Sequence, residues 1–364
     1  MVLLSICIPT FNRSAYLAET LHRCISDIED GNLSTNVEIL VGDNASSDDT
    51  SHVCLDLVSK YQFIYYIKNK ENIGGERNWL NLINLATGRY VWILSDDDDF
   101  LPGLVADIIQ ILEKLDYAAI FLNYNFFEDI DKNKTFGMAS KYYVDDVGVG
   151  RQSFFQKTEF ASSFISSNIF NRACFLENLP TIDLYKGNPW LQLYVVDKIV
   201  GENSNYYYYS TPKLKMRAVS VEDSRSRAHM QGLHHFYFNA HMDFIEFLDY
   251  LNWGDSDIKK KMIASQFSQI MYERKSWYEL TGREDYQYWF LMIKKFIALG
   301  YFNKTATFWY RDIFLMLIPF KFISMVNYLF KIKHKVGIWI RACEGSRDVF
   351  KKYIFFLYSW YRRR

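Results

Sequence analysis

Short apolar runs of strand length alternate with longer amphipathic stretches through about the first hundred residues. Each run ends in polar or glycine-containing residues, a pattern typical of buried parallel strands. The predicted strands cover residues 3–8, 37–41, 63–67 and 90–94. Helices are predicted between them, the first from the spacing of Leu17, Leu21 and Ile25. This alternation predicts an α/β fold with a doubly wound parallel sheet.

The pattern is less regular after residue 102. The further predicted elements are a helix to about residue 115, strands at 118–124, 162–171 and 206–210, and helices at 173–178 and 190–200. Polar composition predicts a variable loop at 128–152 and a surface loop at 212–235, and helical periodicity begins at about residue 236. The expected domains are an α/β domain at 1–235, with a regular part at 1–120 and a less regular part at 121–235, and a helical, aromatic and basic region at 236–364.

Charge is balanced overall but not along the chain. Lys plus Arg and Asp plus Glu both total 42, whereas residues 304–364 hold thirteen basic residues against three acidic ones. Basic clusters beside aromatic helices suit an anionic membrane surface. A buried helix pair with snorkelling cations is the alternative. Nucleic-acid binding is disfavoured by the acidic stretch described below.

The five cysteines are scattered and form no CxxC pair. This pattern argues against a disulfide framework or structural zinc and predicts a reducing compartment. The residues after Met1 lack a basic region and a cleavage site, and no run reaches about 18 apolar residues. We therefore expect neither a signal peptide nor a simple spanning helix.

Four consecutive acids, Asp96 to Asp99, follow the strand at 90–94 and precede Pro102. The carboxyl ends of parallel strands are where open α/β sheets bind ligands. Adjacent carboxylates repel one another unless a cation compensates, and Mg²⁺ or Mn²⁺ takes carboxylate and phosphate oxygens as ligands. The stretch therefore predicts a metal-diphosphate site. A solvated acidic turn, or an N-cap for the next helix, is the alternative.

Polar groups also follow two other predicted strands, at residues 10–13 and at Asp43. We expect all three strand ends to meet at one edge of the sheet. Asp43 could accept hydrogen bonds from the N–H groups of a nucleotide base, with Arg77 or Arg13 near the phosphates. The alternatives are an Asx-turn for Asp43 and a surface helix cation for Arg77.

Five motifs occur in a fixed order within about the first 120 residues. They lie at residues 8–13, 42–50, 72–78, 86–90 and 96–98. Together they resemble the signature of family 2 glycosyltransferases of the GT-A fold, similar to abequosyltransferase-like and other O-antigen or surface-polysaccharide enzymes. The resemblance implies a mixed sheet flanked by helices, with a helical C-terminal appendage. It also implies that residues 1–235 are the catalytic domain, with nucleotide-sugar binding at 1–120 and the acceptor side at 121–235. It also implies an inverting transferase that uses a nucleotide-diphospho-sugar and Mn²⁺ or Mg²⁺.

The resemblance also assigns residues by position. Those expected to contact the nucleotide-sugar are Pro9, Thr10, Asn12, Arg13, Asp43 at the base, Arg77 at the diphosphate, Asp96 and Asp97. The family's Asp-x-Asp motif falls on residues 95–97, so its first acid is Ser95 here. We therefore expect Asp97 to bind the metal, with Asp96 supporting it and touching the ribose, and Asp98 behind them.

An inverting transferase needs a base to deprotonate the acceptor hydroxyl. Family members often place it in a Glu-Asp pair before a helix, but no acid directly precedes the helix predicted at 190–200. The candidates are Asp183, then Asp197, then Glu222 or Asp223. Each candidate has an alternative interpretation. Asp183 could be a turn residue, Asp197 an ion-pair partner of Lys198 or Arg217, and Glu222 and Asp223 part of a solvated loop. Basic residues at 212–235 could form a flap over the diphosphate, with His229 as an added metal ligand.

Two functions of different classes remain. The first is transfer to a glycan or polyprenyl-linked saccharide, which implies peripheral attachment at the cytoplasmic face of an inner membrane and leaves a homo-oligomer open. The second is an inactive nucleotide-sugar-binding or scaffolding subunit. We expect the first function. The second would apply if Ser95 and the lack of a Glu-Asp pair before the helix at 190–200 have removed essential catalytic parts.

Overall fold

The computed structural model describes residues 2–128, 131–182, 188, 190–217, 243–244, 246–248 and 250–251. The chain divides into two compact units, residues 1–269 and 270–364, and every described residue belongs to the first. Candidates outside the described residues are Asp183, Glu222, Asp223 and His229. The predicted boundary at residue 235 stays a prediction.

The first half contains four strands and three helices in strict alternation. They are β1 (Leu4–Thr10), α1 (Ser14–Asp30), β2 (Val37–Asp43), α2 (Thr50–Lys60), β3 (Ile64–Lys68), α3 (Gly75–Leu85) and β4 (Tyr90–Ile93). Every element predicted in this half is present. Strands β2 and β4 are buried along their whole length, as expected for apolar runs, and the buried acids Glu38 and Asp43 of β2 are hydrogen-bonded.

The second half is less regular. Its elements are β5 (Asp99–Phe100), α4 (Leu104–Leu112), β6 (Ala119–Glu128), β7 (Asp131–Phe136), β8 (Asp146–Val149), α5 (Arg151–Thr158), the 3₁₀ turns η1 (Glu159–Ser163) and η2 (Ile165–Ser167), β9 (Asn168–Asn171), α6 (Arg172–Ile182), α7 (Leu191–Val200) and β10 (Asn205–Arg217). The predicted loop at 128–152 is wrong, because it contains β7 and β8. The strand predicted at 162–171 is shorter, because η1 and η2 occupy its first part.

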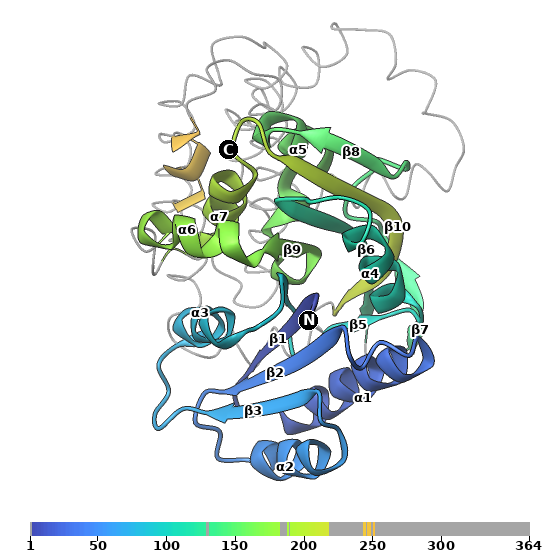
Figure 1. The fold of residues 1–364 in the computed structure, drawn as a ribbon, viewed down its shortest axis with the longest axis vertical. Coiled ribbons are helices and arrows are strands. Elements are labelled where there is room, and N and C mark those ends of the chain that lie inside the picture. Colours follow the sequence, from blue (N-terminus) through green and yellow to red (C-terminus); the bar gives the residue numbers. More distant parts are fainter. Residues whose placement is uncertain are drawn as a thin grey trace, which may run out of the picture. The chain divides into compact units, whose positions relative to one another are not determined.

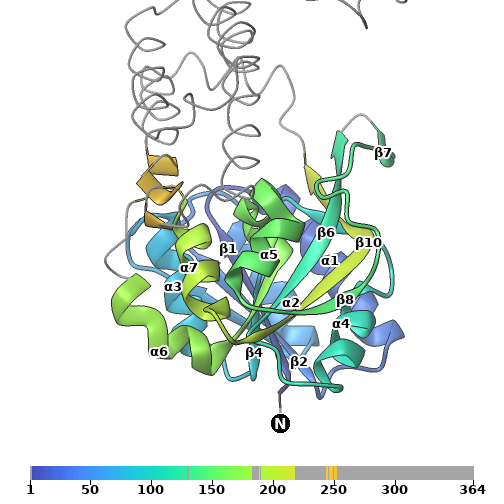
Figure 2. The same ribbon diagram turned by 90° about the horizontal axis from the view of Figure 1, so that it is seen from above.

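The strands form one mixed sheet in the order β3-β2-β1-β4-β9-β6-β10-β5, with β7 on β6 and β8 on β10. Strands β1 to β4 are parallel, whereas β9 runs antiparallel to both of its neighbours, β4 and β6. Helices α3, α6 and α7 lie on one face and α1 and α4 on the other (Figure 1, Figure 2). The α/β mixed sheet is confirmed: β1 to β4 pair in parallel, as do β6 and β10, and the remaining described pairings are antiparallel.

Strand β10 continues well beyond the predicted end at residue 210. It pairs with β6 as far as Arg217 and with β5 at Leu214 and Lys215. Lys213 and Lys215 form ion pairs with Asp107 and Asp99. The first residues of the predicted flap, 212–217, therefore belong to the sheet, because acids on neighbouring elements accept their cations.

The N-terminus of α4 is capped by an acid from another helix. The carboxylate of Asp27, in α1, accepts hydrogen bonds from the backbone N–H groups of Gly103 and, at 2.7 Å, Val105. Gly103 adopts the left-handed conformation, with φ of 82°. The four-acid run therefore does not cap α4, and the alternative interpretation of the run as an N-cap is wrong.

Residues 243–244, 246–248 and 250 are helical, and their aromatic side chains pack against the second half of the sheet domain. Phe244 contacts Phe160 and Trp190, with ring centroids 5.1 and 5.7 Å apart, and Phe247 lies 4.9 Å from Tyr194 in α7. This part of the region predicted to be helical thus adds aromatic surface to the core around α7. Within the described part of the chain, no helix has the length and apolarity needed to cross a membrane.

We predict that Asp27→Ala lowers the free energy of unfolding by about 1–3 kcal/mol, because two buried N–H groups at the start of α4 lose their acceptor. Urea denaturation followed by circular dichroism measures the change. Asp30→Ala is the matched control, since Asp30 is an exposed acid on the same helix. Equal destabilisation by both variants would contradict the capping role of Asp27.

Candidate functional site

Three strand ends converge at the carboxyl edge of the parallel sheet (Figure 1). Thr10, at the end of β1, pairs in register with Asp43, at the end of β2. The Thr10 hydroxyl donates a 2.7 Å hydrogen bond to Asp96, which follows β4. The structure thus brings together the predicted residues of three motifs.

Asp96 is an anchor within this cluster. It is 3% exposed, and its two oxygens accept hydrogen bonds from Thr10 and, at 3.0 Å, from the Arg13 guanidinium. Burial raises the pKa of Asp96, although Arg13 and Thr10 act in the opposite direction. With both oxygens engaged inside the protein, Asp96 holds the loop after β1 against the turn after β4.

Asp97 is the partly open acid of this turn. Its side chain is 24% exposed, against 4% for Asp96. One oxygen accepts a 2.5 Å hydrogen bond from Ser95, and the other lies 3.0 Å from the same Nη1 of Arg13. A single guanidinium nitrogen therefore bridges two carboxylates, and Asp97 is the one that a ligand in solvent can reach.

Asp98 points into the protein. Its oxygens accept hydrogen bonds from the Ser166 hydroxyl at 2.7 Å and from the Arg217 backbone N–H at 3.2 Å. Burial, followed by the nearby charge of Asp97, raises the pKa of Asp98 well above its ordinary value. Asp98 therefore joins η2 and β10 to the acidic turn and does not face the open side.

Asp99 belongs to β5 and pairs with Arg23, at 3.2 Å, and Lys215. Burial raises the pKa of Asp99, but the contacts with Lys215, the Phe100 N–H and Arg23 together outweigh it and lower the pKa overall. The four acids thus diverge, and Arg13, Arg23 and Lys215 balance their charge. Protein cations therefore supply part of the compensation that the four adjacent carboxylates were expected to need, and a metal at this turn stays a prediction.

The backbone of the acidic turn is held from two sides. The Thr20 hydroxyl, in α1, lies 3.0 and 3.1 Å from the carbonyl oxygens of Asp96 and Asp98. Nε of Arg217, at the end of β10, donates a 2.7 Å hydrogen bond to the carbonyl of Asp97. The Arg217 guanidinium also stacks on Tyr16, 4.5 Å from the ring centroid.

Sequence reasoning did not identify Thr20 or Ser166 and placed Arg217 in a flap. Thr20 left one signal, a hydroxyl on the apolar face that also carries Leu17 and Leu21. Ser166 left none, because its partners are about seventy positions away in the chain. These residues position the acids, although none was predicted to bind a ligand.

Asp43 is fully buried at the end of β2. Its carboxylate accepts hydrogen bonds from the Ser46 N–H at 2.7 Å and the Tyr66 hydroxyl at 2.6 Å, with Lys68 at 3.6 Å. Burial raises the pKa of Asp43, but these hydrogen bonds outweigh it and lower the pKa overall. The contact with Ser46 matches the predicted turn role, and the contact with a base stays a prediction.

The loop before α3 is tied to β2 by asparagines. Asn44 bonds to Asn72 at 2.7 Å and accepts the Ile73 N–H at 2.9 Å, and Asn78 donates to the Gly42 carbonyl. This network holds the first turn of α3 beside the Asp43 strand end. Arg77 lies in that turn and is exposed, as expected for a residue that awaits a diphosphate or only faces solvent.

Asn12 closes the loop after β1 onto the loop after β2. It adopts a positive φ of 52°, and its side chain accepts the Ser47 N–H at 2.8 Å. Pro9 lies in β1 and pairs in register with Gly42. Phe11, between Thr10 and Asn12, is 42% exposed and was not predicted as a site residue. An exposed aromatic ring at a strand end is the signal that could have identified it.

One motif of the family signature lies at the other edge of the sheet. Glu38, 4% exposed, accepts hydrogen bonds from Ser5, the Thr87 N–H and the Thr87 hydroxyl. A Cβ on Gly88 would lie 2.5 Å from the Ser5 hydroxyl, so only glycine fits there. Residues 86–90 therefore shape the entry to β4 and make no contact with the acidic turn.

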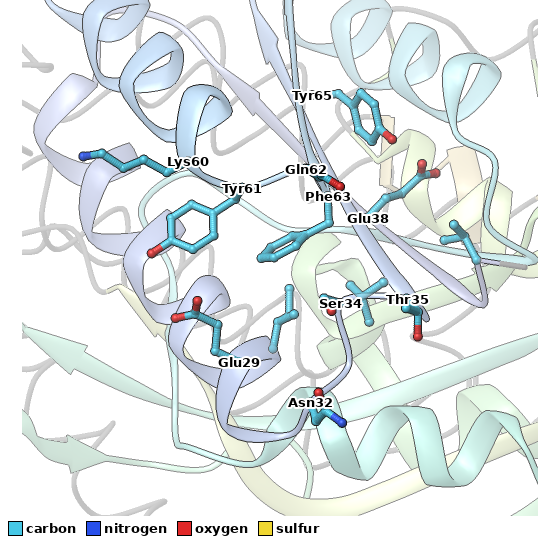
Figure 3. Close-up of a pocket in the computed structure, with 13 residues that line it drawn as sticks. Glu29, Asn32, Ser34, Thr35, Glu38, Lys60, Tyr61, Gln62, Phe63 and Tyr65 are labelled. Carbon is cyan, nitrogen blue, oxygen red and sulfur yellow. The ribbon is translucent and has the colours of Figure 1, made fainter.

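A cavity of about 650 Å³ also lies at that opposite edge (Figure 3). Its lining includes Val2, Val37 and Phe63, which stand at the amino ends of β1, β2 and β3. The cavity is therefore remote from the carboxyl edge of the sheet, where the motifs at residues 8–13, 42–50 and 96–98 place their polar groups. It is not part of the candidate site.

Asp197 was the second candidate for the base. It lies in α7, fully buried, 3.3 Å from the Arg151 guanidinium and 2.9 Å from the Tyr250 hydroxyl. Burial raises the pKa of Asp197, while Tyr250 and Arg151 oppose the shift. An ion pair was one predicted alternative, but the partner is Arg151, not Lys198 or Arg217. Full burial disfavours contact with an acceptor hydroxyl.

The residues fit a divalent ion only in a restricted way. In the described portion of the chain, no three His, Cys, Asp or Glu side chains converge as a metal cage. Asp97 can offer one partly exposed carboxylate. One or two carboxylates, completed by substrate phosphates and water, are the usual arrangement for Mg²⁺.

Residues 5–175 match the family model of glycosyl transferase family 2. The chain is 41% identical over 113 residues to abequosyltransferase RfbV of Salmonella typhimurium, covering 31% of this chain and 32% of that protein. It is 30% identical over 197 residues to GalNAc(5)-diNAcBac-PP-undecaprenol beta-1,3-glucosyltransferase of Campylobacter jejuni, covering 52% of this chain and 59% of that protein. The match thus spans about a third to three fifths of these relatives.

Solved structures show the same fold. A crystal structure of S. aureus TarS 1–349 aligns with a TM-score of 0.57 at 15% identity, covering 82% of this chain and 81% of that one. A complex of the same protein with UDP-GlcNAc aligns with a TM-score of 0.52 at 14% identity, covering 82% and 90%. The predicted resemblance is confirmed: over residues 5–175 the chain carries a glycosyltransferase family 2 domain, and its fold is GT-A.

Proposed function

We propose that this chain is an inverting glycosyltransferase of surface-polysaccharide synthesis. It moves a hexosyl or deoxyhexosyl group from a nucleotide-diphospho-sugar to a glycan or polyprenyl-linked saccharide. The observation that carries the proposal is the joining of Thr10, Arg13, Asp96 and Asp97 at the carboxyl edge of a family 2 domain. Relatives named for saccharide transfer support the substrate class.

The donor nucleotide lies across the ends of β1 and β2. The exposed ring of Phe11 offers a stacking surface for the base, and Asp43 stands at the adjoining strand end to orient it. Arg77, exposed in the first turn of α3, and Arg13 supply positive charge for the diphosphate. The ribose contact expected of Asp96 stays a prediction, since Thr10 and Arg13 engage both of its oxygens, and Pro9 and Asn12 shape the loop that receives the nucleotide.

The divalent ion, Mn²⁺ or Mg²⁺, is held by Asp97, with Asp96 behind it. When bound, such an ion neutralises negative charge that develops on the leaving diphosphate. The protein contributes the orientation of Asp97, since Thr20 and Arg217 fix the turn that carries it. Ser95 in place of the first acid of the motif leaves one fewer carboxylate and adds a hydroxyl donor to Asp97.

We predict that Asp97→Asn abolishes Mn²⁺-dependent nucleotide binding and lowers transfer by roughly a hundredfold or more, because the ion loses its exposed carboxylate. A thermal-shift screen of UDP, CDP, GDP and dTDP with and without Mn²⁺ gives the binding readout. Asp99→Asn is the matched control, since Asp99 faces Arg23 and Lys215. Full turnover by the Asp97→Asn variant would contradict the assignment of Asp97 as the metal ligand.

The general base is proposed among the carboxylates that precede or follow α7. Asp183 is the first candidate and Asp223 the next, and both lie outside the described residues. Asp197 is assigned instead to the buried pair with Arg151.

We predict that Asp183→Asn lowers kcat by about 10²–10⁴-fold without changing the melting temperature, the loss typical of a positioned base. Asp197→Asn should instead lower the free energy of unfolding by about 1–3 kcal/mol and leave the kcat of the folded enzyme near that of the wild type. Steady-state kinetics and urea denaturation on both variants separate the roles. An unchanged kcat for Asp183→Asn would move the assignment to Asp223.

The basic, aromatic end of the chain is proposed to hold the enzyme on an anionic membrane, where a polyprenyl-linked acceptor lies. Thirteen basic residues between 304 and 364 supply the attraction, on the order of 1 kcal/mol each near the surface. The proposal rests on sequence, since these residues are outside the described part.

We predict that removing residues 305–364 releases the protein from vesicles containing anionic phosphatidylglycerol, because most of the basic surplus is lost. Co-sedimentation with these vesicles measures the change, and neutral phosphatidylcholine vesicles are the control. Unchanged sedimentation of the truncated protein with anionic vesicles would favour the buried helix pair.

A further inference from the structure

Arg13 occupies the place that an added cation would have to enter. Its Nη1 lies 3.0 Å from Oδ1 of Asp96 and 3.0 Å from Oδ2 of Asp97. The other oxygen of Asp97 accepts a hydrogen bond from Ser95. Both oxygens of the partly exposed carboxylate are therefore already engaged, one of them by a full positive charge.

A divalent ion and a guanidinium cannot share one carboxylate oxygen without strong repulsion. At a separation of about 4 Å, a divalent ion and a guanidinium repel each other strongly even at the dielectric constant of water. The repulsion corresponds to a loss of roughly tenfold or more in the affinity for the ion. Metal binding at this oxygen of Asp97 therefore requires Arg13 to leave it, and a metal at the other oxygen would still lie near the Arg13 charge. The Ser95 hydroxyl presents no such conflict, because it is neutral and can rotate.

The two ends of the Arg13 bridge are not equivalent. Asp96 is 4% exposed and is fixed by Thr10 from a neighbouring strand, whereas Asp97 is 24% exposed. Leaving the buried Asp96 without its counter-ion would cost more than leaving the half-open Asp97. The exchange is therefore confined to Asp97, and Arg13 stays anchored on Asp96.

We propose that Arg13 is the resident counter-ion of Asp97 in the metal-free protein and that a divalent ion displaces it. The inference rests on the proposed metal site. Arg13 thereby weakens metal binding until the donor arrives, and its released N–H groups then face the diphosphate beside the ion. Metal and nucleotide binding are coupled through this one side chain, since each favours the arrangement that the other needs.

Arg23 provides a matched control for the loss of positive charge. It also pairs with an acid of the four-residue run, Asp99, and its side chain is 37% exposed, against 36% for Arg13. Asp99 has a second cation, Lys215, and lies in β5. Removing the Arg23 charge therefore changes the local net charge by the same amount as removing the Arg13 charge, but it leaves the contact between Arg13 and Asp97 in place.

The test is Mn²⁺ binding to the full chain without nucleotide, followed by the electron paramagnetic resonance signal of free Mn²⁺. Arg13→Gln is expected to bind Mn²⁺ about tenfold more tightly than the wild type, because the competing charge is gone. Arg13→Met keeps the apolar stem of the side chain and is expected to tighten Mn²⁺ binding to the same extent. It replaces the Gln variant in the test if that variant does not fold. Arg23→Gln is expected to stay within about twofold of the wild type, the scale of ordinary surface charge effects.

Wild-type affinity in both Arg13 variants, or equal tightening in Arg23→Gln, would overturn the inference. The Asp97→Asn variant in the same titration separates this failure from that of the proposed function. If Asp97→Asn loses Mn²⁺ binding while the Arg13 variants match the wild type, only the counter-ion role falls. If Asp97→Asn binds Mn²⁺ as the wild type does, the metal assignment itself is wrong.

Discussion

The candidate site depends on how the protein separates four negative charges that are adjacent in the chain. Asp96 faces Arg13 and Thr10, Asp98 faces Ser166 and a backbone N–H, and Asp99 faces Arg23 and Lys215. A carboxylate buried without a partner would shift its pKa or destabilise the fold, so these contacts are conditions for the turn to exist. Asp97 and Asp99 both keep partly exposed side chains, 24% and 20%, but Asp99 is held by Arg23 and Lys215, so Asp97 is the partly exposed acid beside Thr10 and Arg13.

The partners of the acidic turn come from elements far apart in sequence, and this explains much of the fold. Thr20 and Arg23 project from α1, Ser166 from η2, and Lys215 and Arg217 from the end of β10. Strand β10 must therefore run past residue 210 to deliver its cations, and β5 pairs with it at that point. The first and second halves of the sheet are joined where the charge is concentrated.

The predictable parts of this molecule are those encoded by local pattern. Strands β1 to β4 follow from apolar runs bounded by polar turns, and the strand ends that carry Thr10, Asp43 and Asp96 meet as parallel topology requires. The antiparallel direction of β9 was not predicted, because the sequence of a four-residue strand does not indicate in which direction it runs within a sheet. The role of Arg217 was not predicted. Basic residues that alternate with Leu214 and Met216 are typical of a solvated loop, and the acids that pair with them come from elements distant in the sequence.

The same contrast separates the motifs of the family signature by what they do. Residues 86–90 are held by Glu38 and Ser5 at the amino edge of the sheet, where Gly88 is required by close packing. Residues 8–13 and 96–98 instead place charged groups at the carboxyl edge, where packing alone would not select them. A motif can therefore recur because it shapes the entry to a strand or because it presents charge to a ligand. For this chain, only the burial and partners of each side chain distinguish the two cases.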